Sequence, residues 1–149
     1  MPYKHVLAAI DLSAEAAQVL EKARATADSN GAKLSLINLV KPLSQVYGGL
    51  DMAPIANGSV SFEKEALQKA SQQMRDHAKI YRVDAADVHV KIGGPAQEIR
   101  DAAIELEADL IVVGTHGRHG LGLLLGSTAN AVLHGVGCDV LAVRVRVSE

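Results

Sequence analysis

Short runs of aliphatic residues alternate along this chain with stretches in which apolar residues recur at helical spacing. Runs that are short and rich in β-branched residues are typical of strands buried in a sheet. The sequence predicts five of them, at Tyr3–Ile10, Lys33–Val40, Asp87–Ile92, Asp109–Val113 and Val140–Val147. Strands that alternate with helical stretches in this way indicate an α/β fold.

The helical stretches carry their apolar residues in stripes, which we interpret as faces that pack on the sheet. The first helix follows Ser13, a suitable N-cap, has Glu15 in its first turn and ends at Gly31, which can adopt the left-handed conformation. Its apolar stripe consists of Ala16, Leu20, Ala23 and Ala27.

Three further helices are predicted in the same way. They cover Ser61 to Arg82, the segment from Pro95 through Leu106, and Leu125 to Val136. Proline is favoured in the first turn of a helix, which supports a start at Pro95. The segment Lys41–Ser61 is rich in Gly, Pro, Asn and Ser and has no periodicity, so we expect a long surface loop there.

Each crossover between parallel strands must be right-handed and must bury a helix against the sheet. We therefore expect one domain, residues 1–149, with an open Rossmann-like five-stranded parallel sheet in the order 3-2-1-4-5 and two helices on each face. In this order the first and fourth strands are neighbours, and their carboxyl ends flank the crevice in which such sheets bind ligands. Asp11 and Gly114 follow these two strands, so the topology predicts that they lie close together.

A glycine-rich segment, GTHGRHGLGLLLGST, connects the fourth strand to the fourth helix. Gly114 and Gly117 leave the strand, and Gly126, Ser127 and Thr128 open the helix. Unpaired amides and the positive end of the helix are therefore available for a phosphate. The alternative is a loop whose glycines serve only tight packing.

Side chains near this loop extend the nucleotide interpretation. Arg118 or His116 could reach a phosphate oxygen, and the carboxylate of Asp11 could accept hydrogen bonds from a ribose or a base amino group. The combination indicates a nucleotide with its base near the first two strands. Asp11 could instead serve only as a turn or helix-capping residue.

Other common active-site patterns are missing from the sequence. There is no Gly-Lys-Ser/Thr of a phosphate loop, no convincing dinucleotide fingerprint and no GxSxG nucleophile elbow. His116, His119 and His134 have no carboxylate at a spacing characteristic of zinc, so we predict no metal site. Cys138 precedes an apolar strand, and we expect it to be buried and inert.

Composition excludes several classes of partner. The 149 residues carry a formal net charge of -2, with 15 Lys and Arg against 17 Asp and Glu, so nucleic acid is a poor candidate. No apolar stretch approaches the roughly 20 residues of a membrane span, and the amino terminus looks like a strand rather than a signal peptide. A single cysteine suits a reducing cytoplasm.

Several motifs, taken in order, resemble the universal stress protein family. They are AAIDLS after the first strand, LINLV in the second, DLIVVGTHG, LLLGSTANAVL and the closing CDVLAVRV. The resemblance covers essentially the whole chain and implies the five-stranded parallel sheet described above. It also implies a homodimer formed through the last strand. Members with the glycine motif typically bind ATP, whereas a branch that resembles universal stress protein A does not.

The resemblance implies a role for each matching position. Ala9 and Asp11 would approach the adenine or ribose and Leu39 the base. The ribose and phosphates would contact Val113, Gly114, His116, Gly117 and Arg118, and the terminal phosphates Gly126, Ser127 and Thr128. The loop Arg118–Leu125 is one residue shorter than the family's usual motif, and YKHVLAAIDLS resembles the non-binding branch.

The last strand gives a separate indication of assembly. An open edge formed by VLAVRVRV is a liability that proteins usually pair or cover. Pairing of Val140–Val147 across a two-fold axis with the same strand of a second chain would give a homodimer, with Arg144 and Arg146 on an exposed face. The alternative is an edge protected by those two charges alone.

Three functions remain open from the sequence. The first is a cytoplasmic stress-response sensor or regulator that binds ATP with little or no turnover, any slow hydrolysis requiring Mg²⁺ brought by the nucleotide. The second is a nucleotide-independent dimeric interaction module of the universal stress protein A type, with protein partners. The third is a hydrolase or adenylating enzyme of similar fold, for which the sequence offers no catalytic cluster.

Overall fold

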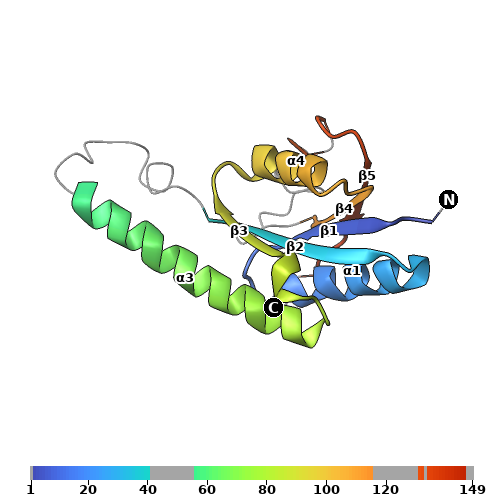
Figure 1. Cartoon of the computed structure of the whole chain (residues 1–149), viewed down its shortest axis with the longest axis horizontal. Coiled ribbons are helices and arrows are strands. Elements are labelled where there is room, and N and C mark those ends of the chain that lie inside the picture. The colour runs from blue at the N-terminus through green and yellow to red at the C-terminus, as the bar shows by residue number, and fades with distance from the viewer. Residues whose placement is uncertain (1, 41–55, 116–130, 133, 147–149) are drawn as a thin grey trace.

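Five strands form one parallel sheet in the order β3-β2-β1-β4-β5, which confirms the predicted topology. The computed structural model describes residues 2–40, 56–115, 131–132 and 134–146, drawn in colour in Figure 1. The strands are β1 (His5–Ala9), β2 (Lys33–Val40), β3 (Val88–Ile92), β4 (Leu110–Gly114) and β5 (Asp139–Val143).

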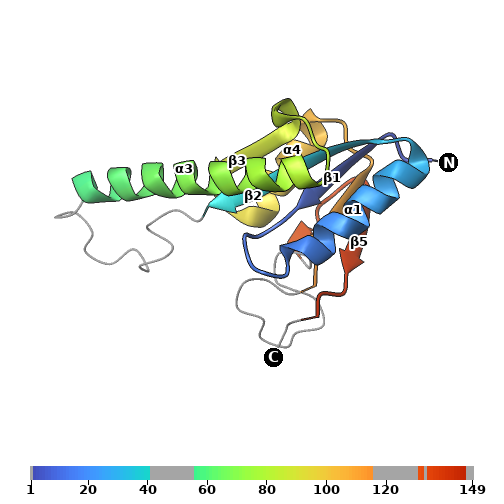
Figure 2. The same cartoon turned by 90° about the horizontal axis from the view of Figure 1, so that it is seen from below.

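Helices cover both faces of this sheet. Figures 1 and 2 show α1 (Ala16–Asn30) and α3 (Ala56–Ile80) on one face and α4 (Pro95–Glu105) on the other. A short 3₁₀ helix, η2 (Ala85–Asp87), precedes β3. Of the fourth predicted helix, residues 131–132 are helical, and residues 125–130 lie outside the described part of the chain.

The core consists of two apolar layers, one on each side of the sheet. Val6 and Ala8 of β1 face α1 and α3, whereas Leu7 faces α4, and all three are fully buried. Strands buried on both faces need apolar residues at every position. This requirement explains the aliphatic runs from which β1 and β4 were predicted.

The start of α1 differs from the prediction. The helix begins at Ala16, and Glu15 occupies the N-cap position without a side-chain hydrogen bond. Ser13 is therefore not the N-cap and Glu15 does not lie in the first turn, because the Ser13 hydroxyl instead donates to Asp11 Oδ1 at 2.6 Å. At the other end Gly31 has φ 64°, as predicted for a left-handed helix stop.

The second predicted helix starts earlier than expected. α3 begins at Ala56, so the final residues of the predicted loop Lys41–Ser61 are helical, and residues 41–55 lie outside the described ranges. Its buried face consists of Ala70, Met74 and Ala78. The opposite, amino-terminal part of α3 extends beyond the sheet in both views, and Phe62 on it is exposed.

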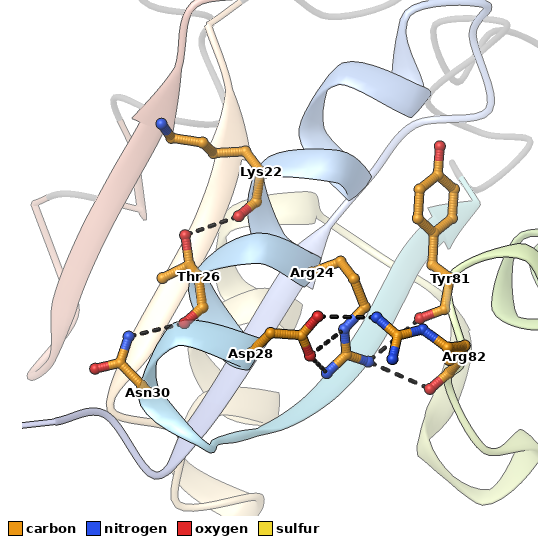
Figure 3. A network of polar contacts seen from close by, with 7 residues as sticks. All are labelled: Lys22, Arg24, Thr26, Asp28, Asn30, Tyr81 and Arg82. Atoms are coloured by element: carbon orange, nitrogen blue, oxygen red, sulfur yellow. Dashed lines mark hydrogen bonds and ion pairs between the residues drawn. The ribbon is translucent and has the colours of Figure 1, made fainter.

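A network of charged groups ties the carboxyl end of α3 to α1 (Figure 3). Asp28 accepts from Arg24 at Oδ1 and from Arg82 at Oδ2, each at 2.8 Å. Arg24 also donates to the carbonyl oxygens of Tyr81 and Arg82. Hydrogen bonds from Arg82 and Arg24 outweigh burial and lower the pKa of the exposed Asp28 carboxyl. The network joins the turn that follows α3 to α1.

The last strand is shorter than predicted. β5 ends at Val143, and residues 144–146 lie outside it, because β4 ends at Gly114 and offers no further ladder. Instead the Gln18 amide of α1 binds the Arg146 backbone twice, with Nε2 donating to the carbonyl at 2.7 Å and Oε1 accepting from the N–H at 2.9 Å. Arg144 and Arg146 are exposed, and Val145 between them is buried.

Candidate functional site

The two central strands part at their carboxyl ends. β1 and β4 are paired from Val6–Leu110 to Ala8–Val112 only. Beyond that point β1 stays with β2, through Ala9–Ile37, and β4 stays with β5, through Gly114–Val143. This separation occurs at the predicted switch point of the strand order, which is where open α/β sheets bind ligands.

Asp11 lies directly beyond the end of β1 in a turn that leads to α1. Its Oδ1 accepts from the backbone N–H of Ser13 at 3.2 Å and from the Ser13 hydroxyl at 2.6 Å. None of the described residues forms a hydrogen bond or an ion pair with its other carboxylate oxygen, Oδ2. Asp11 therefore performs the predicted turn role through Oδ1 alone among these residues.

The residue before Asp11, Ile10, is held by β2 through both its backbone N–H and its carbonyl. The N–H of Ile10 donates to the carbonyl of Ile37 at 3.0 Å. Its own carbonyl accepts from the side-chain Nδ2 of Asn38 at 2.8 Å. The side chain of Asn38 is buried, so this contact is shielded from water.

Three predicted site residues lie in the strands and face α4. Ala9 and Leu39 are partly buried against the core layer on that side. Val113 is 2% exposed, which places its side chain inside the core. Any contact of Val113 with a ligand would therefore have to come from its backbone.

Both ends of the glycine-rich segment are anchored. After Gly114, the Thr115 N–H donates to the Val143 carbonyl at 2.9 Å, and Thr115 Oγ1 accepts from the Val145 N–H at 3.1 Å. At the far end, Arg100 of α4 donates to the Ala131 carbonyl at 3.1 Å. The predicted residues between these anchors lie outside the described ranges: His116, Gly117, Arg118, Gly126, Ser127 and Thr128.

Sequence reasoning missed the residues that support the site from behind. No role was predicted for Asn38, Thr115 or Arg100, because their roles depend on contacts with distant segments. One signal was present for Asn38, because an amide within the aliphatic run LSLINLV must find a partner when buried.

Three titratable groups with shifted pKa values, Asp109, His89 and Cys138, lie on the opposite, amino-terminal part of the sheet. Burial alone would raise the pKa of Asp109, but backbone N–H groups of His5 and Lys4 outweigh it and lower this pKa. Burial lowers the pKa of His89, whose Nε2 is buried without a hydrogen-bond partner. Cys138 is half-buried rather than fully buried, and burial raises the pKa of its thiol.

The residues that the structure describes carry neither a metal-binding cluster nor a membrane-spanning helix. No group of three His, Cys, Asp or Glu side chains there is arranged to hold a metal ion. Among the same residues, no helix has the length and apolar character needed to cross a bilayer. His116 and His119 lie outside the part of the chain to which these two statements apply.

Comparison with known proteins identifies similar chains. Residues 2–144 match the model of the universal stress protein family. Universal stress protein A homolog 1 of Coxiella burnetii is 41% identical over 143 residues, which cover 96% of this chain and 97% of that protein.

Two solved structures are similar in fold. Universal stress protein UspA from Lactobacillus plantarum matches with a TM-score of 0.82 at 22% identity, over 97% of this chain and 99% of that one. A universal stress protein crystallised in complex with cAMP matches with a TM-score of 0.62 at 27% identity, over 97% and 98% of the two chains.

Proposed function

The chain belongs to the universal stress protein family, as its motifs predicted, and we propose that it is a stress-response sensor or regulator that binds ATP at the carboxyl ends of β1 and β4. One observation carries this proposal: where β1 and β4 separate beyond Ala8–Val112, the Oδ2 of Asp11 accepts no hydrogen bond from any of the described residues. The cAMP complex of a similar protein supports an adenine nucleotide as the ligand.

Each part of the nucleotide has a proposed partner. Asp11 accepts from a ribose hydroxyl through Oδ2, while Ala9 and Leu39 lie beside the base. Amides of the glycine-rich segment bind the phosphates, since such amides are good anion donors at the start of a helix. The proposed phosphate residues are Val113 (backbone), Gly114, His116, Gly117, Arg118, Gly126, Ser127 and Thr128.

The proposal includes little or no turnover. The Asp11 carboxylate is the acidic side chain assigned to the site, and its Oδ1 accepts two hydrogen bonds from Ser13. Mg²⁺ would enter with the nucleotide and neutralise phosphate charge. A chain that signals by binding alone needs only a difference between its bound and free forms.

We further propose that the whole chain, residues 1–149, is one cytoplasmic domain that forms a homodimer through β5. β5 pairs with β4 on one side, and residues Val140–Val143 on it are only partly buried. The interface would use Asp139–Val143 and not the full predicted strand Val140–Val147, because Gln18 occupies the Arg146 backbone.

A second function, a nucleotide-independent interaction module, is favoured by one observation. The segment Arg118–Leu125 is one residue shorter than the family's usual ATP motif. One extended residue spans up to about 3.5 Å, enough to displace an amide from a phosphate oxygen. In that case the outer edge of β5, and not the carboxyl ends of β1 and β4, would carry the function.

Isothermal titration calorimetry with ATP and Mg²⁺ tests these alternatives. We expect saturable binding that weakens about tenfold in Asp11→Ala, the effect of losing one hydrogen bond to a charged group. Gly117→Val should weaken it as well. Asp84→Ala is the matched control, since Asp84 is exposed on the turn before η2 and makes no capping hydrogen bond. Absence of binding heat would instead favour the interaction module.

A further inference from the structure

Asn38 is a buried amide at the carboxyl end of a strand that is otherwise apolar on that face. The described part of the chain contains three buried polar residues, Ser35, Asn38 and Thr115, with Asn38 only 5% exposed. Ser35 bonds to His5, and Thr115 bonds to Val145. Asn38 bonds to the segment that leads into Asp11.

Its contact acts on a single peptide group. Asn38 Nδ2 donates to the Ile10 carbonyl at 2.8 Å, and that carbonyl belongs to the peptide unit that joins Ile10 to Asp11. A peptide unit is planar, so a bond that holds its oxygen also fixes the orientation of the N–H and Cα of the next residue. The Ile10 N–H is fixed independently by Ile37.

We propose that Asn38 is a positioning residue for the nucleotide site, which it serves by fixing the Ile10–Asp11 peptide and thereby the direction of Asp11 Oδ2. This inference rests on the proposed function. Ser13 holds Oδ1 from one side, and Asn38 holds the backbone from the other. Together they orient the remaining oxygen before a ribose hydroxyl arrives, which lowers the ordering cost of binding.

The first test needs no ligand. Asn38→Leu keeps roughly the shape of the side chain and removes the donor. We expect hydrogen exchange at the Ser13 amide, which reports the Asp11 turn, to rise about fivefold, the effect of losing one hydrogen bond of ordinary strength. Leu36→Val is the control, because Leu36 is buried on the same face of β2 and makes no side-chain hydrogen bond. Asn38→Ala replaces the leucine variant if that variant does not fold.

The second test is a double-mutant cycle with Asp11, measured by calorimetry with ATP and Mg²⁺. Asn38→Leu should raise the ATP Kd about threefold to tenfold in the unsubstituted protein. In the Asp11→Ala background the same substitution should change Kd by less than about twofold, because its effect passes through Asp11. A purely structural role for Asn38 would give equal changes in both backgrounds.

The outcomes separate the two proposals. If the unsubstituted protein binds no ATP, the proposed function fails and this inference fails with it. If ATP binds and Asp11→Ala weakens binding, but Asn38→Leu has the same effect in both backgrounds or leaves Ser13 exchange unchanged, only the role of Asn38 is overturned.

Discussion

Two aspartates lie at opposite ends of the paired central strands, and they are used differently. Asp109, just before β4, accepts from the Lys4 N–H at Oδ2 (2.9 Å) and from the His5 N–H at Oδ1 (3.0 Å), and its own N–H donates to the His5 carbonyl. Asp11, just after β1, accepts at Oδ1 from Ser13, and none of the described residues bonds to its Oδ2. The fold therefore uses both oxygens of Asp109, whereas the described residues use only one oxygen of Asp11.

We call the amino ends of the five strands the amino edge of the sheet and their carboxyl ends the carboxyl edge. The same contrast holds between these two edges. At the amino edge Tyr3 donates to Asp139 at 2.7 Å, and both ring nitrogens of His5 bond to Leu106 and Ser35. At the carboxyl edge β1 and β4 separate. The amino edge thus carries contacts that stabilise the fold, whereas the proposed function assigns ligand binding to the carboxyl edge.

The largest effect on stability is expected from Asp109→Ala. The substitution leaves the N–H groups of Lys4 and His5 without their charged acceptor, which should lower the free energy of unfolding by about 2 kcal/mol. Urea unfolding at pH 7 measures this change. Asp84→Ala should change stability by less than about 0.5 kcal/mol, as is usual for an exposed site.

The contribution of Asp109 should also depend on pH. Its pKa is lowered from the ordinary value of 3.8 in the folded protein, so the stabilisation is complete above that value and is lost as pH falls through the folded pKa. Unfolding curves of the unsubstituted protein and Asp109→Ala should therefore converge in acid. Curves that remain equally separated at pH 7 and pH 2 would contradict this.

The next largest effect concerns ligand affinity. Here we expect the larger effect from Asp11→Ala, whereas for stability we expect it from Asp109→Ala. Asp11→Ala should weaken ATP binding about tenfold and cost less than about 1 kcal/mol of stability, because only the turn contacts with Ser13 are lost. Asp109→Ala should leave the ATP Kd within about twofold. Calorimetry and urea unfolding of both variants give the four values, and equal effects on both properties would remove the contrast between the edges.

A smaller effect is expected at His89. It lies on the amino-terminal part of the sheet, but its ring nitrogen Nε2 has no hydrogen-bond partner. Leucine would remove a buried nitrogen that has no partner, which should raise the free energy of unfolding by about 1 kcal/mol at pH 7. His5→Leu is the opposing control and should destabilise the protein, because both His5 nitrogens are bonded.

The advantage of His89→Leu should grow in mild acid. Burial lowers the pKa of His89 below its ordinary value of 6.5, so the unfolded chain takes up this proton before the folded protein does. Stability of the unsubstituted protein therefore falls as pH drops from 6.5 towards the folded pKa. Thermal unfolding at pH 7.5 and pH 5.5 measures the difference, and a leucine variant with no added advantage at pH 5.5 would argue against it.

The smallest effect is expected at Glu107, which follows α4 with φ 55°. Glycine adopts this left-handed conformation without the steric cost of a side chain, so Glu107→Gly should stabilise by about 0.5 kcal/mol and raise Tm by about 2 °C. Arg82 has a similar φ of 59°, but Arg82→Gly also removes the bond to Asp28 and should gain less. Differential scanning calorimetry compares the two.

Periodicity was sufficient to predict the central strands because both faces of β1, β2 and β4 are largely buried, whereas β3 and β5 are only partly buried. Alternation with helices indicates a parallel sheet with right-handed crossovers, and the order 3-2-1-4-5 is one arrangement that satisfies them. The adjacency of β1 and β4, whose carboxyl ends lead to Asp11 and Gly114, agrees with this order, although a hundred residues of chain separate the two segments.

Element ends were predicted less well because they depend on competing partners. Serine is a residue type favoured at the N-cap of a helix, yet the hydroxyl of Ser13 donates to Asp11 instead. The alternation of VLAVRVRV continues past Val143, but a strand needs a neighbour and β4 has already ended. Asn57, Gly58 and Ser59 resemble a loop but lie within α3, where propensity is outweighed by the rest of the helix.

Hydrogen–deuterium exchange of the whole protein with and without ATP and Mg²⁺ tests the central claim most directly. Binding at the carboxyl edge should slow exchange in the Asp11–Ser13 turn and at Gly114 and Thr115, while amides at the amino edge, such as His5 and Asp109, should change little. Protection confined to the amino edge, or no ATP-dependent change in either region, would contradict the account.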